Sequence, residues 1–232
     1  MKASTQLPGP PPARPRVLEA DGIQVSFGGR CLLSDVYLRV QTGQVVGLLG
    51  RNGSGKSTLL QTIFGGRRVP DASVRVDGRF VAPAYRVPGL LNYLPQVPLL
   101  PPHLPLSAAA RLLGVALEPA LRAFPELREQ ASRPVGELSG GTVRLAQVLL
   151  LLYADTAFSL FDEPFSGVMP VHIEALAAAI GQQKQHKGIL LTDHRYTEVL
   201  PLCDAVYLLH DGRLQLLREP LPELRDRGYL PT

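Results

Sequence analysis

Short apolar runs separated by turn residues divide this chain into predicted strands. The runs Gln44–Leu49, Ala157–Phe161 and Gly188–Thr192 are too short for helices and apolar nearly throughout, which indicates parallel strands buried on both faces. Looser alternation over Val17–Phe27 and Val36–Val40 indicates two antiparallel strands ahead of the first buried run. The pattern therefore predicts an α/β fold, with a mixed, mainly parallel sheet and an N-terminal antiparallel β-subdomain.

Helical spacing of apolar residues marks several of the segments between these strands. Three of them are predicted helices: Leu59–Phe64, Val143–Tyr153 and His172–Gln183. Over Leu106–Gln130 the same spacing is broken by prolines, and Ser107 is a candidate N-cap for the first helix there. We therefore expect a small helical subdomain, inserted at about residues 97–137 and carried on the main sheet.

Composition changes this outline mainly at the two ends. Residues 1–16 hold five prolines and no apolar core, so they are predicted to be a flexible lead-in without a secretory signal. Residues 17–218 form the predicted domain and 219–232 a short C-terminal tail. No run is apolar enough to span a bilayer, and two cysteines favour a reducing compartment over a disulfide framework. The net charge of +4 includes no dense basic run, so direct contact with nucleic acid is not expected.

A glycine-rich loop stands between the first buried strand and the first predicted helix. It consists of Gly50, Arg51, Asn52, Gly53, Ser54, Gly55, Lys56, Ser57 and Thr58. This context suits a phosphate-binding loop, because glycines let backbone N–H groups turn inward and the helix directs its positive end to the same point. We expect Lys56 to reach the β- and γ-phosphates of a nucleotide and Ser57 to coordinate Mg²⁺. A glycine-rich turn that binds nothing is the alternative.

Polar residues follow three other predicted strands. Gln96 ends a short strand, Asp162 and Glu163 follow the second buried run, and His194 follows the third. The carboxyl ends of parallel strands meet at one edge of a sheet, where ligands bind. We expect Asp162 to hold Mg²⁺, Glu163 to face an attacking water and His194 to face the γ-phosphate.

Two further motifs are candidates for nucleotide contacts. Ser139, Gly140 and Gly141 precede a predicted helix and form a second possible anion site. Phe27 ends the first strand beside a glycine turn, where its ring is placed either to stack on a base or to join the core. The pattern alone leaves these two interpretations of Phe27 open.

With these motifs in order, the chain closely resembles the nucleotide-binding subunit of ATP-binding cassette (ABC) transporters, a branch of the P-loop NTPases. The resemblance covers roughly Val17–Leu217. It assigns the motifs as follows: Gly50–Thr58 to the Walker A loop, Phe27 to the adenine-stacking aromatic, Gln96 to the Q-loop, Ser139–Gly141 to the signature, Asp162 and Glu163 to the Walker B strand and catalytic base, and His194 to the switch histidine. It also implies that Glu163, His194, Gln96 and Lys56 serve catalysis, and that Ser57, Gln96 and Asp162 hold the metal.

The same resemblance implies an ATPase that uses ATP and Mg²⁺ and works as a dimer on the cytoplasmic face of a membrane. Two subunits, expected to be two copies of this chain, would pack head to tail with ATP between the Walker A loop of one and Ser139 and Gly141 of the other. Hydrolysis would then drive a separate transmembrane permease.

Three departures from the family pattern bear on this expectation. Thr142 stands where Gln or Glu usually follows the signature, Met169 replaces the Asp that usually couples the two sites, and Arg51 replaces a common proline. ATP binding is expected to survive all three. Two alternatives stay open: a hydrolysis-impaired ATP switch, and a soluble ABC-type ATPase acting on nucleic acid or ribosomes.

Overall fold

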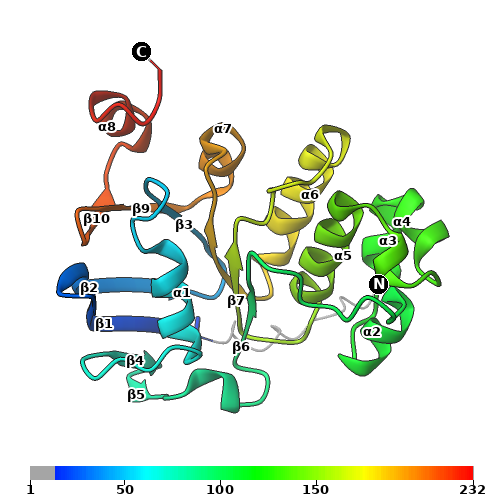
Figure 1. Cartoon of the computed structure of the whole chain (residues 1–232), viewed down its shortest axis with the longest axis horizontal. Helices are drawn as coiled ribbons and strands as arrows, with labels where there is room; N and C mark the ends of the chain where they lie inside the picture. The colour runs from blue at the N-terminus through cyan, green and yellow to red at the C-terminus, as the bar shows by residue number, and fades with distance from the viewer. Residues whose placement is uncertain (1–13, 232) are drawn as a thin grey trace, which may run out of the picture.

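The computed structural model describes residues 14–231, and the predicted lead-in therefore lies outside the described residues except for 14–16. The strands are β1 (Val17–Phe27), β2 (Arg30–Gln41), β3 (Val45–Leu49), β4 (Ser73–Val76), β5 (Arg79–Phe80), β6 (Leu91–Leu94), β7 (Phe158–Asp162), β8 (Gly188–Thr192), β9 (Ala205–His210) and β10 (Arg213–Leu217). The α-helices are α1 (Lys56–Phe64), α2 (Leu106–Leu112), α3 (Glu118–Ala123), α4 (Pro125–Gln130), α5 (Gly140–Leu152), α6 (Pro170–Gln183), α7 (Tyr196–Val199) and α8 (Pro220–Asp226). Figure 1 shows their arrangement.

Within the described range the strands form two sheets. The first is antiparallel, with the order β2-β1-β4-β5. The second has the order β10-β9-β3-β8-β7-β6 and is parallel except for β10, which runs antiparallel to β9. The predicted α/β fold, with an N-terminal antiparallel β-subdomain and a mixed, mainly parallel sheet, is therefore confirmed.

The buried strands lie between two apolar clusters. All residues of β3, β7 and β8 are buried, as the continuous apolar runs predict. Along β3, Val45 and Leu49 belong to one cluster, while Val46 and Leu48 belong to the other, because successive side chains point to opposite faces. Helix α1 fills the space between the two sheets, and α5 and α6 pack on the other face of the large sheet.

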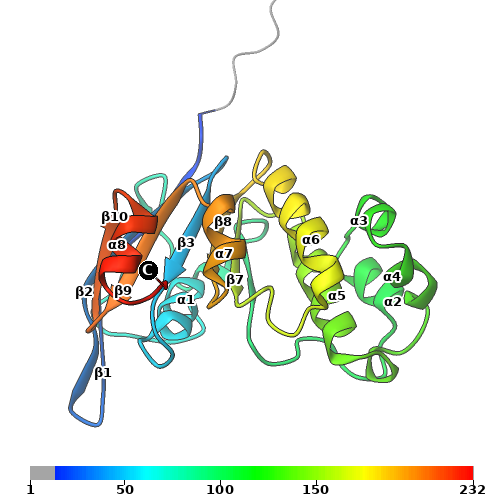
Figure 2. The ribbon, with the colours of Figure 1, turned by 90° about the horizontal axis from the view of Figure 1, so that it is seen from above.

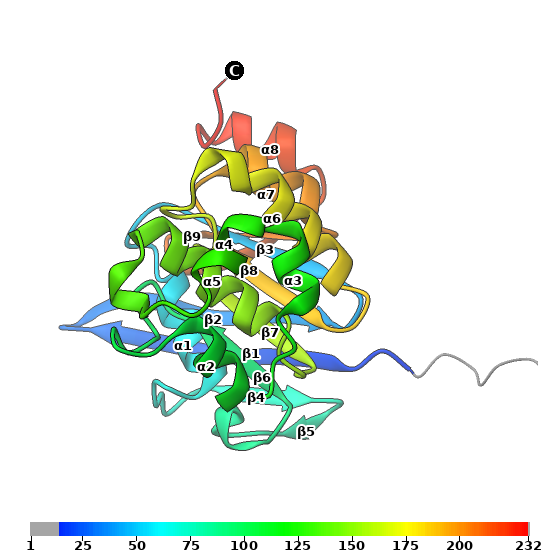
Figure 3. The ribbon, with the colours of Figure 1, turned by 90° about the vertical axis from the view of Figure 1, so that its right-hand side faces the viewer.

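Helices α2, α3 and α4 form a separate group beyond α5, as Figure 2 shows, and this side of the molecule faces the viewer in Figure 3. The prolines that interrupt the pattern begin new helices, because Pro119 and Pro125 occupy first-turn positions where a missing N–H costs nothing. The predicted N-cap Ser107 is wrong. Pro105 precedes the first residue of α2, and the Ser107 backbone N–H donates to the carbonyl of Ala131 at 2.9 Å.

Helices α5 and α6 begin earlier than the apolar spacing predicts, as does α1, which begins at Lys56 rather than Leu59. Helix α5 begins at Gly140 rather than Val143, because the Ser139 hydroxyl accepts a hydrogen bond from the Thr142 N–H and caps the helix there. Helix α6 begins at Pro170, whose fixed φ suits a first helical turn. Both differences arise from polar or proline positions that apolar periodicity does not register.

Candidate functional site

The glycine loop turns sharply into helix α1 and holds its lysine close. Gly55 precedes the helix with φ 109°, a left-handed conformation that favours glycine. Lys56 is 6% exposed, and its Nζ donates to the carbonyls of Gly50 at 2.8 Å and Arg51 at 3.2 Å. Burial lowers the pKa of Lys56, against the opposing effect of Glu163 and other nearby carboxylates. The Lys56 ammonium group therefore lies against the glycine loop, next to the backbone N–H groups at the start of α1.

A cavity of about 470 Å³ opens on this loop. Its lining is Leu32, Asn52, Gly53, Gly55, Lys56, Ser57, Thr58, Gln96 and Glu163. Residues from the loop, from the segment after β6 and from the end of β7 therefore meet at one place, although they are far apart in the sequence. This is the carboxyl edge of the parallel sheet, where the sequence predicts them to converge.

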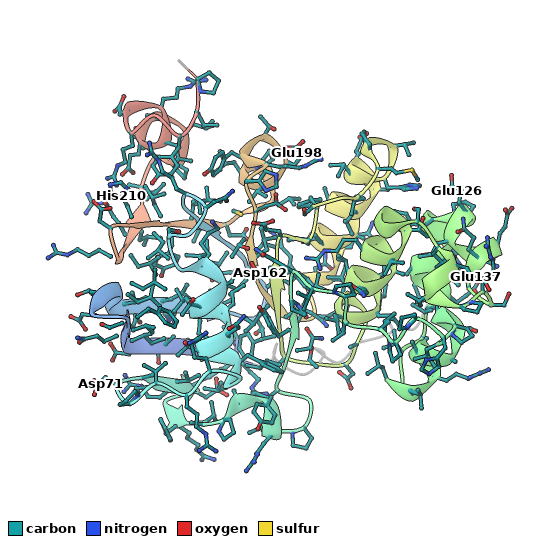
Figure 4. All side chains as sticks on the ribbon, viewed as in Figure 1. Asp71, Glu126, Glu137, Asp162, Glu198 and His210 are labelled. Carbon is teal, nitrogen blue, oxygen red and sulfur yellow. The ribbon has the colours of Figure 1, made fainter. Side chains whose placement is uncertain are left out.

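Asp162 is at the centre of this edge (Figure 4). It is 1% exposed, and its Oδ1 accepts from the Thr192 hydroxyl at 2.9 Å and from Gln96 Nε2 at 3.4 Å. Gln96 Nε2 also lies 3.4 Å from the Ser57 hydroxyl oxygen. The structure thus brings together Ser57, Gln96 and Asp162, the three predicted metal ligands.

These groups are a hydroxyl, an amide and one carboxylate, which suits a hard cation that also binds phosphate oxygens and water. Among the described residues, no group of three His, Cys, Asp or Glu side chains could hold a metal ion. The arrangement therefore fits Mg²⁺ carried with a nucleotide and is unlike a dedicated carboxylate cage.

Two residues that the sequence patterns did not identify hold Asp162 in place. The Thr192 hydroxyl donates to one carboxylate oxygen, and the Tyr93 hydroxyl donates to the other at 3.2 Å. Burial, with Asp162 next in effect, raises the pKa of Tyr93 to about 12. The local sequence around Tyr93 and Thr192 does not predict these hydrogen bonds. The pairing register of the strands decides which side chains lie next to Asp162.

Glu163 has an unusual backbone conformation that directs its side chain into the cavity. Its φ is 54°, and its N–H donates to the Thr192 carbonyl at 3.0 Å. Glu163 Oε2 lies 3.8 Å from His194 Nδ1, and the His194 side chain is 54% exposed. The predicted base and the predicted switch histidine are therefore neighbours, with the histidine open to solvent.

Asp193, another residue missed by the sequence patterns, organises the adjoining loops. Its side chain is fully buried, and its Oδ1 accepts from the N–H groups of His194 at 2.8 Å and Arg195 at 3.0 Å. Its Oδ2 accepts from the Phe165 N–H at 3.1 Å. The carboxylate thus fixes the segment after β8 to the segment after Glu163.

The signature residues Ser139, Gly140 and Gly141 lie at the start of α5, away from the glycine loop. In the described part of the chain they do not line the cavity on that loop, but Gly140 lines a second cavity that Gln96 and Glu163 also border. Gly141 packs so close to the Gly167 carbonyl that a Cβ atom would collide with it. The signature turn is therefore tied to the loop that carries Met169, whose side chain is 46% exposed.

Phe27 and Arg51 have contacts that the sequence does not predict. Phe27 is 47% exposed, so the core interpretation of this residue is wrong, and the Arg67 guanidinium lies 4.8 Å from its ring centroid. Stacking of Phe27 on a base stays a prediction. The Arg51 guanidinium lies 5.6 Å from the ring centroid of Tyr229 in the C-terminal tail.

A parallel sheet with a glycine loop before α1, and with lysine, amide and carboxylates on one cavity, defines a P-loop nucleotide-binding protein. A family model described as ABC transporter matches residues 33–166, more than half of the chain. The chain therefore belongs to the ABC transporter family, whose ATP-binding domains it matches in fold.

Curated relatives and a solved structure agree with this assignment. The chain is 31% identical to a probable ABC transporter ATP-binding protein of Azorhizobium caulinodans, over 88% of this chain and 77% of that one. It is 32% identical to the lipopolysaccharide export system ATP-binding protein of Acidithiobacillus ferridurans, over 88% and 90% respectively. A solved ATP-binding subunit of an ABC transporter matches with a TM-score of 0.78 and 28% identity, over 93% of this chain and 95% of that one.

Proposed function

We propose that this chain binds and hydrolyses ATP as one subunit of a head-to-tail dimer, and that the cycle drives transport through a separate membrane subunit. One observation carries the proposal: Lys56, Gln96 and Glu163 converge on one cavity, while the signature turn lies outside it. A triphosphate on the glycine loop would leave its γ-phosphate partly uncovered. A second helix N-terminus, supplied by another subunit, would complete the electrostatic cradle.

ATP would bind with its phosphates on the N–H groups of the glycine loop and on Lys56. Phe27 is exposed at the end of β1, where its free face would stack on the adenine. Ser57, Gln96 and Asp162 would hold Mg²⁺, which neutralises charge on the β- and γ-phosphate oxygens when bound. Gly50, Arg51, Asn52, Gly53, Ser54, Gly55 and Thr58 complete the proposed nucleotide contacts.

Hydrolysis would use Glu163 as the base. In the proposed step, water attacks the γ-phosphorus, the bond to the bridging oxygen breaks, and the water proton passes to the Glu163 carboxylate. His194, 3.8 Å from Glu163, would contact the γ-phosphate and keep the carboxylate oriented. Gln96 contacts both Ser57 and Asp162, so its position would report whether the metal and phosphate are present.

A membrane partner has a suitable surface beside the Gln96 loop. A cavity of about 460 Å³ there is lined by Phe64, Tyr85, Leu91, Asn92, Tyr93, Leu99, Leu100, Leu104, Ala109, Leu112, Leu113 and Leu151. Leu112 is 78% exposed, and Tyr85 and Leu113 are about half exposed. No helix of the described residues is long and apolar enough to cross a membrane. We place the proposed work at the cytoplasmic face, with this apolar surface against the permease.

A second candidate function is an ATP switch with weak hydrolysis. The Ser139 hydroxyl lies 2.8 Å from the Thr142 hydroxyl and accepts from the Thr142 N–H at 3.2 Å. The same hydroxyl would have to donate to the γ-phosphate of the ATP on the partner's loop. The Thr142 N–H bond leaves its proton free, but donation of that proton to the Thr142 hydroxyl would compete with the bond to phosphate. This competition favours slower completion of the composite site.

The substitution Glu163→Gln tests hydrolysis directly. It keeps the shape of the side chain but removes the base, so turnover should fall on the order of 100-fold or more while ATP-dependent dimerisation strengthens. Steady-state phosphate release and size-exclusion chromatography with ATP measure the two effects. Glu126→Gln, on the exposed face of α4, is the matched control and should change neither. Unchanged turnover in Glu163→Gln would contradict the assignment of Glu163 as the base. A parent protein that dimerises with ATP but does not hydrolyse it would support the second candidate function, the ATP switch.

A further inference from the structure

Arg144, in the second turn of the signature helix α5, has an environment unlike that of a surface arginine. Its side chain is 8% exposed. Nη1 donates to the Pro95 carbonyl at 2.6 Å, and Nη2 donates to the carbonyls of Asp162 and Glu163, the latter at 2.9 Å. One guanidinium group therefore joins the segment before Gln96 to Asp162, the last residue of β7, and to Glu163, the proposed base that follows it.

The charge of Arg144 is buried among carbonyl oxygens, and within residues 14–231 its guanidinium forms no ion pair. Burying a guanidinium costs free energy unless its donors are satisfied, so a role in shape alone would be met more cheaply by an apolar side chain. Burial lowers the pKa of Arg144, and the field of Asp162, Glu163 and Asp193 opposes this effect. The three carboxylates offset part of the cost of burying the positive charge at this edge of the sheet.

The backbone that Arg144 binds is the one that most needs support. Glu163 has φ 54°, a left-handed conformation that a residue with a Cβ seldom adopts without surrounding restraint. Its N–H is held by Thr192 at 3.0 Å on one side, and its carbonyl is held by Arg144 on the other. The two bonds fix the peptide groups on both sides of Glu163 and so fix where its carboxylate points.

Arg144 also stands on the same rigid helix as the signature turn. Ser139 caps α5, and Arg144 follows within about one and a half turns. A helix transmits displacement along its axis because its backbone hydrogen bonds keep its length. Contact between Ser139 and a nucleotide held by the other subunit would therefore shift Arg144, and with it the Glu163 and Pro95 carbonyls to which Arg144 donates.

We propose that Arg144 is a positioning residue that couples the signature of each subunit to the catalytic base of the same subunit. This inference rests on the proposed function. It predicts that hydrolysis at one site depends on whether the nucleotide at the other site engages α5. Arg144 itself touches neither water nor phosphate in this proposal.

The test compares Arg144→Met and Arg144→Lys with the parent. Arg144→Met should lower kcat on the order of 100-fold, because the Glu163 carboxylate loses its orientation. The ATP dissociation constant, measured with a fluorescent ATP analogue, should change less than threefold, because the glycine loop is untouched. Arg144→Lys should restore part of kcat, since an ammonium reaches some of the same carbonyls. Arg122→Met, an arginine 77% exposed on α3, is the control.

Two further readouts keep the outcomes separate. The double variant Glu163→Gln/Arg144→Met should still dimerise with ATP, and the thermal unfolding of Arg144→Lys should match the parent. Parent-like kcat in Arg144→Met would overturn the positioning role, as would a loss of ATP affinity equal to the loss of kcat. Absence of turnover in the parent protein would instead count against the proposed function.

Discussion

Lys187, immediately before β8, is buried at the end of the sheet opposite the glycine loop. It is 2% exposed, and its Nζ donates to the Ala154 carbonyl at 2.6 Å and lies 3.4 Å from the hydroxyls of Thr156 and Ser159. Burial lowers its pKa to about 8, against the opposing field of Asp155. The contacts replace only part of the hydration that the ammonium loses on folding.

This burial predicts a pH dependence of stability. The folded pKa of Lys187, about 8, is below its ordinary value of 10.5, so between these values the unfolded chain binds more protons and stability rises with pH. The gain in the free energy of unfolding from deprotonating Lys187 is complete above pH 10.5, and it is lost as the pH falls to and through 8. Urea unfolding of the parent and Lys187→Met should show the parent gaining roughly 2 kcal/mol relative to the variant between about pH 7.5 and 9.5. An equal pH dependence in both proteins would contradict the prediction, because other titrating groups are common to them.

At the scale of elements, apolar periodicity predicted strands better than helix ends. The predicted strands Val17–Phe27 and Gly188–Thr192 coincide with β1 and β8, because their apolar patterns and turns are local. Ser107 failed as a cap because α2 already begins at Leu106, directly after Pro105, so that Ser107 lies inside the first turn. Several site residues were identified by motif, but Tyr93, Thr192, Asp193 and Arg144 act through contacts between distant segments. Only tertiary register creates such contacts, so no local pattern contains them.

The C-terminal tail is an element that the sequence left without a role. Leu224 of α8 is fully buried, and Tyr229 lies over Arg51 while its hydroxyl pairs with His210 Nδ1 at 3.0 Å. The tail therefore packs against the glycine loop at the position where Arg51 replaces a common proline. A loop restrained in this way is better ordered before nucleotide arrives.

The prediction at this scale concerns ATP affinity. Tyr229→Ala should raise the ATP dissociation constant roughly two- to fivefold, the equivalent of one partly exposed cation–π contact, and Tyr229→Phe should raise it less. Tyr37→Ala, at a more exposed tyrosine on β2 that lies outside the tail, should leave it unchanged. Titration with a fluorescent ATP analogue measures all three. An unchanged constant in Tyr229→Ala would show that the tail does not order the loop.

At the scale of the whole molecule, the glycine loop and the signature turn line two different cavities of one chain. The loop shares its cavity with Gln96 and Glu163, while the signature residue Gly140 lines a second cavity that the same two side chains border. A head-to-tail dimer would place the signature of each subunit over the loop of the other. Each composite site would then need an intact loop from one copy and an intact signature from its partner.

Complementation between two inactive variants tests this central claim most directly. Lys56→Met removes the phosphate contact of the loop, and Ser139→Arg blocks the signature, so each protein alone should hydrolyse ATP at background rate. A mixed dimer contains one site built from the intact loop of one copy and the intact signature of the other. An equimolar mixture should therefore hydrolyse ATP clearly above the background of either variant alone, with roughly one quarter of the parent phosphate-release rate as the ceiling. The Arg144 coupling keeps the rate below that ceiling, because the second site of the mixed dimer has neither an intact loop nor an intact signature. A mixture that stays at background, although the mixed dimer forms, would contradict the composite site.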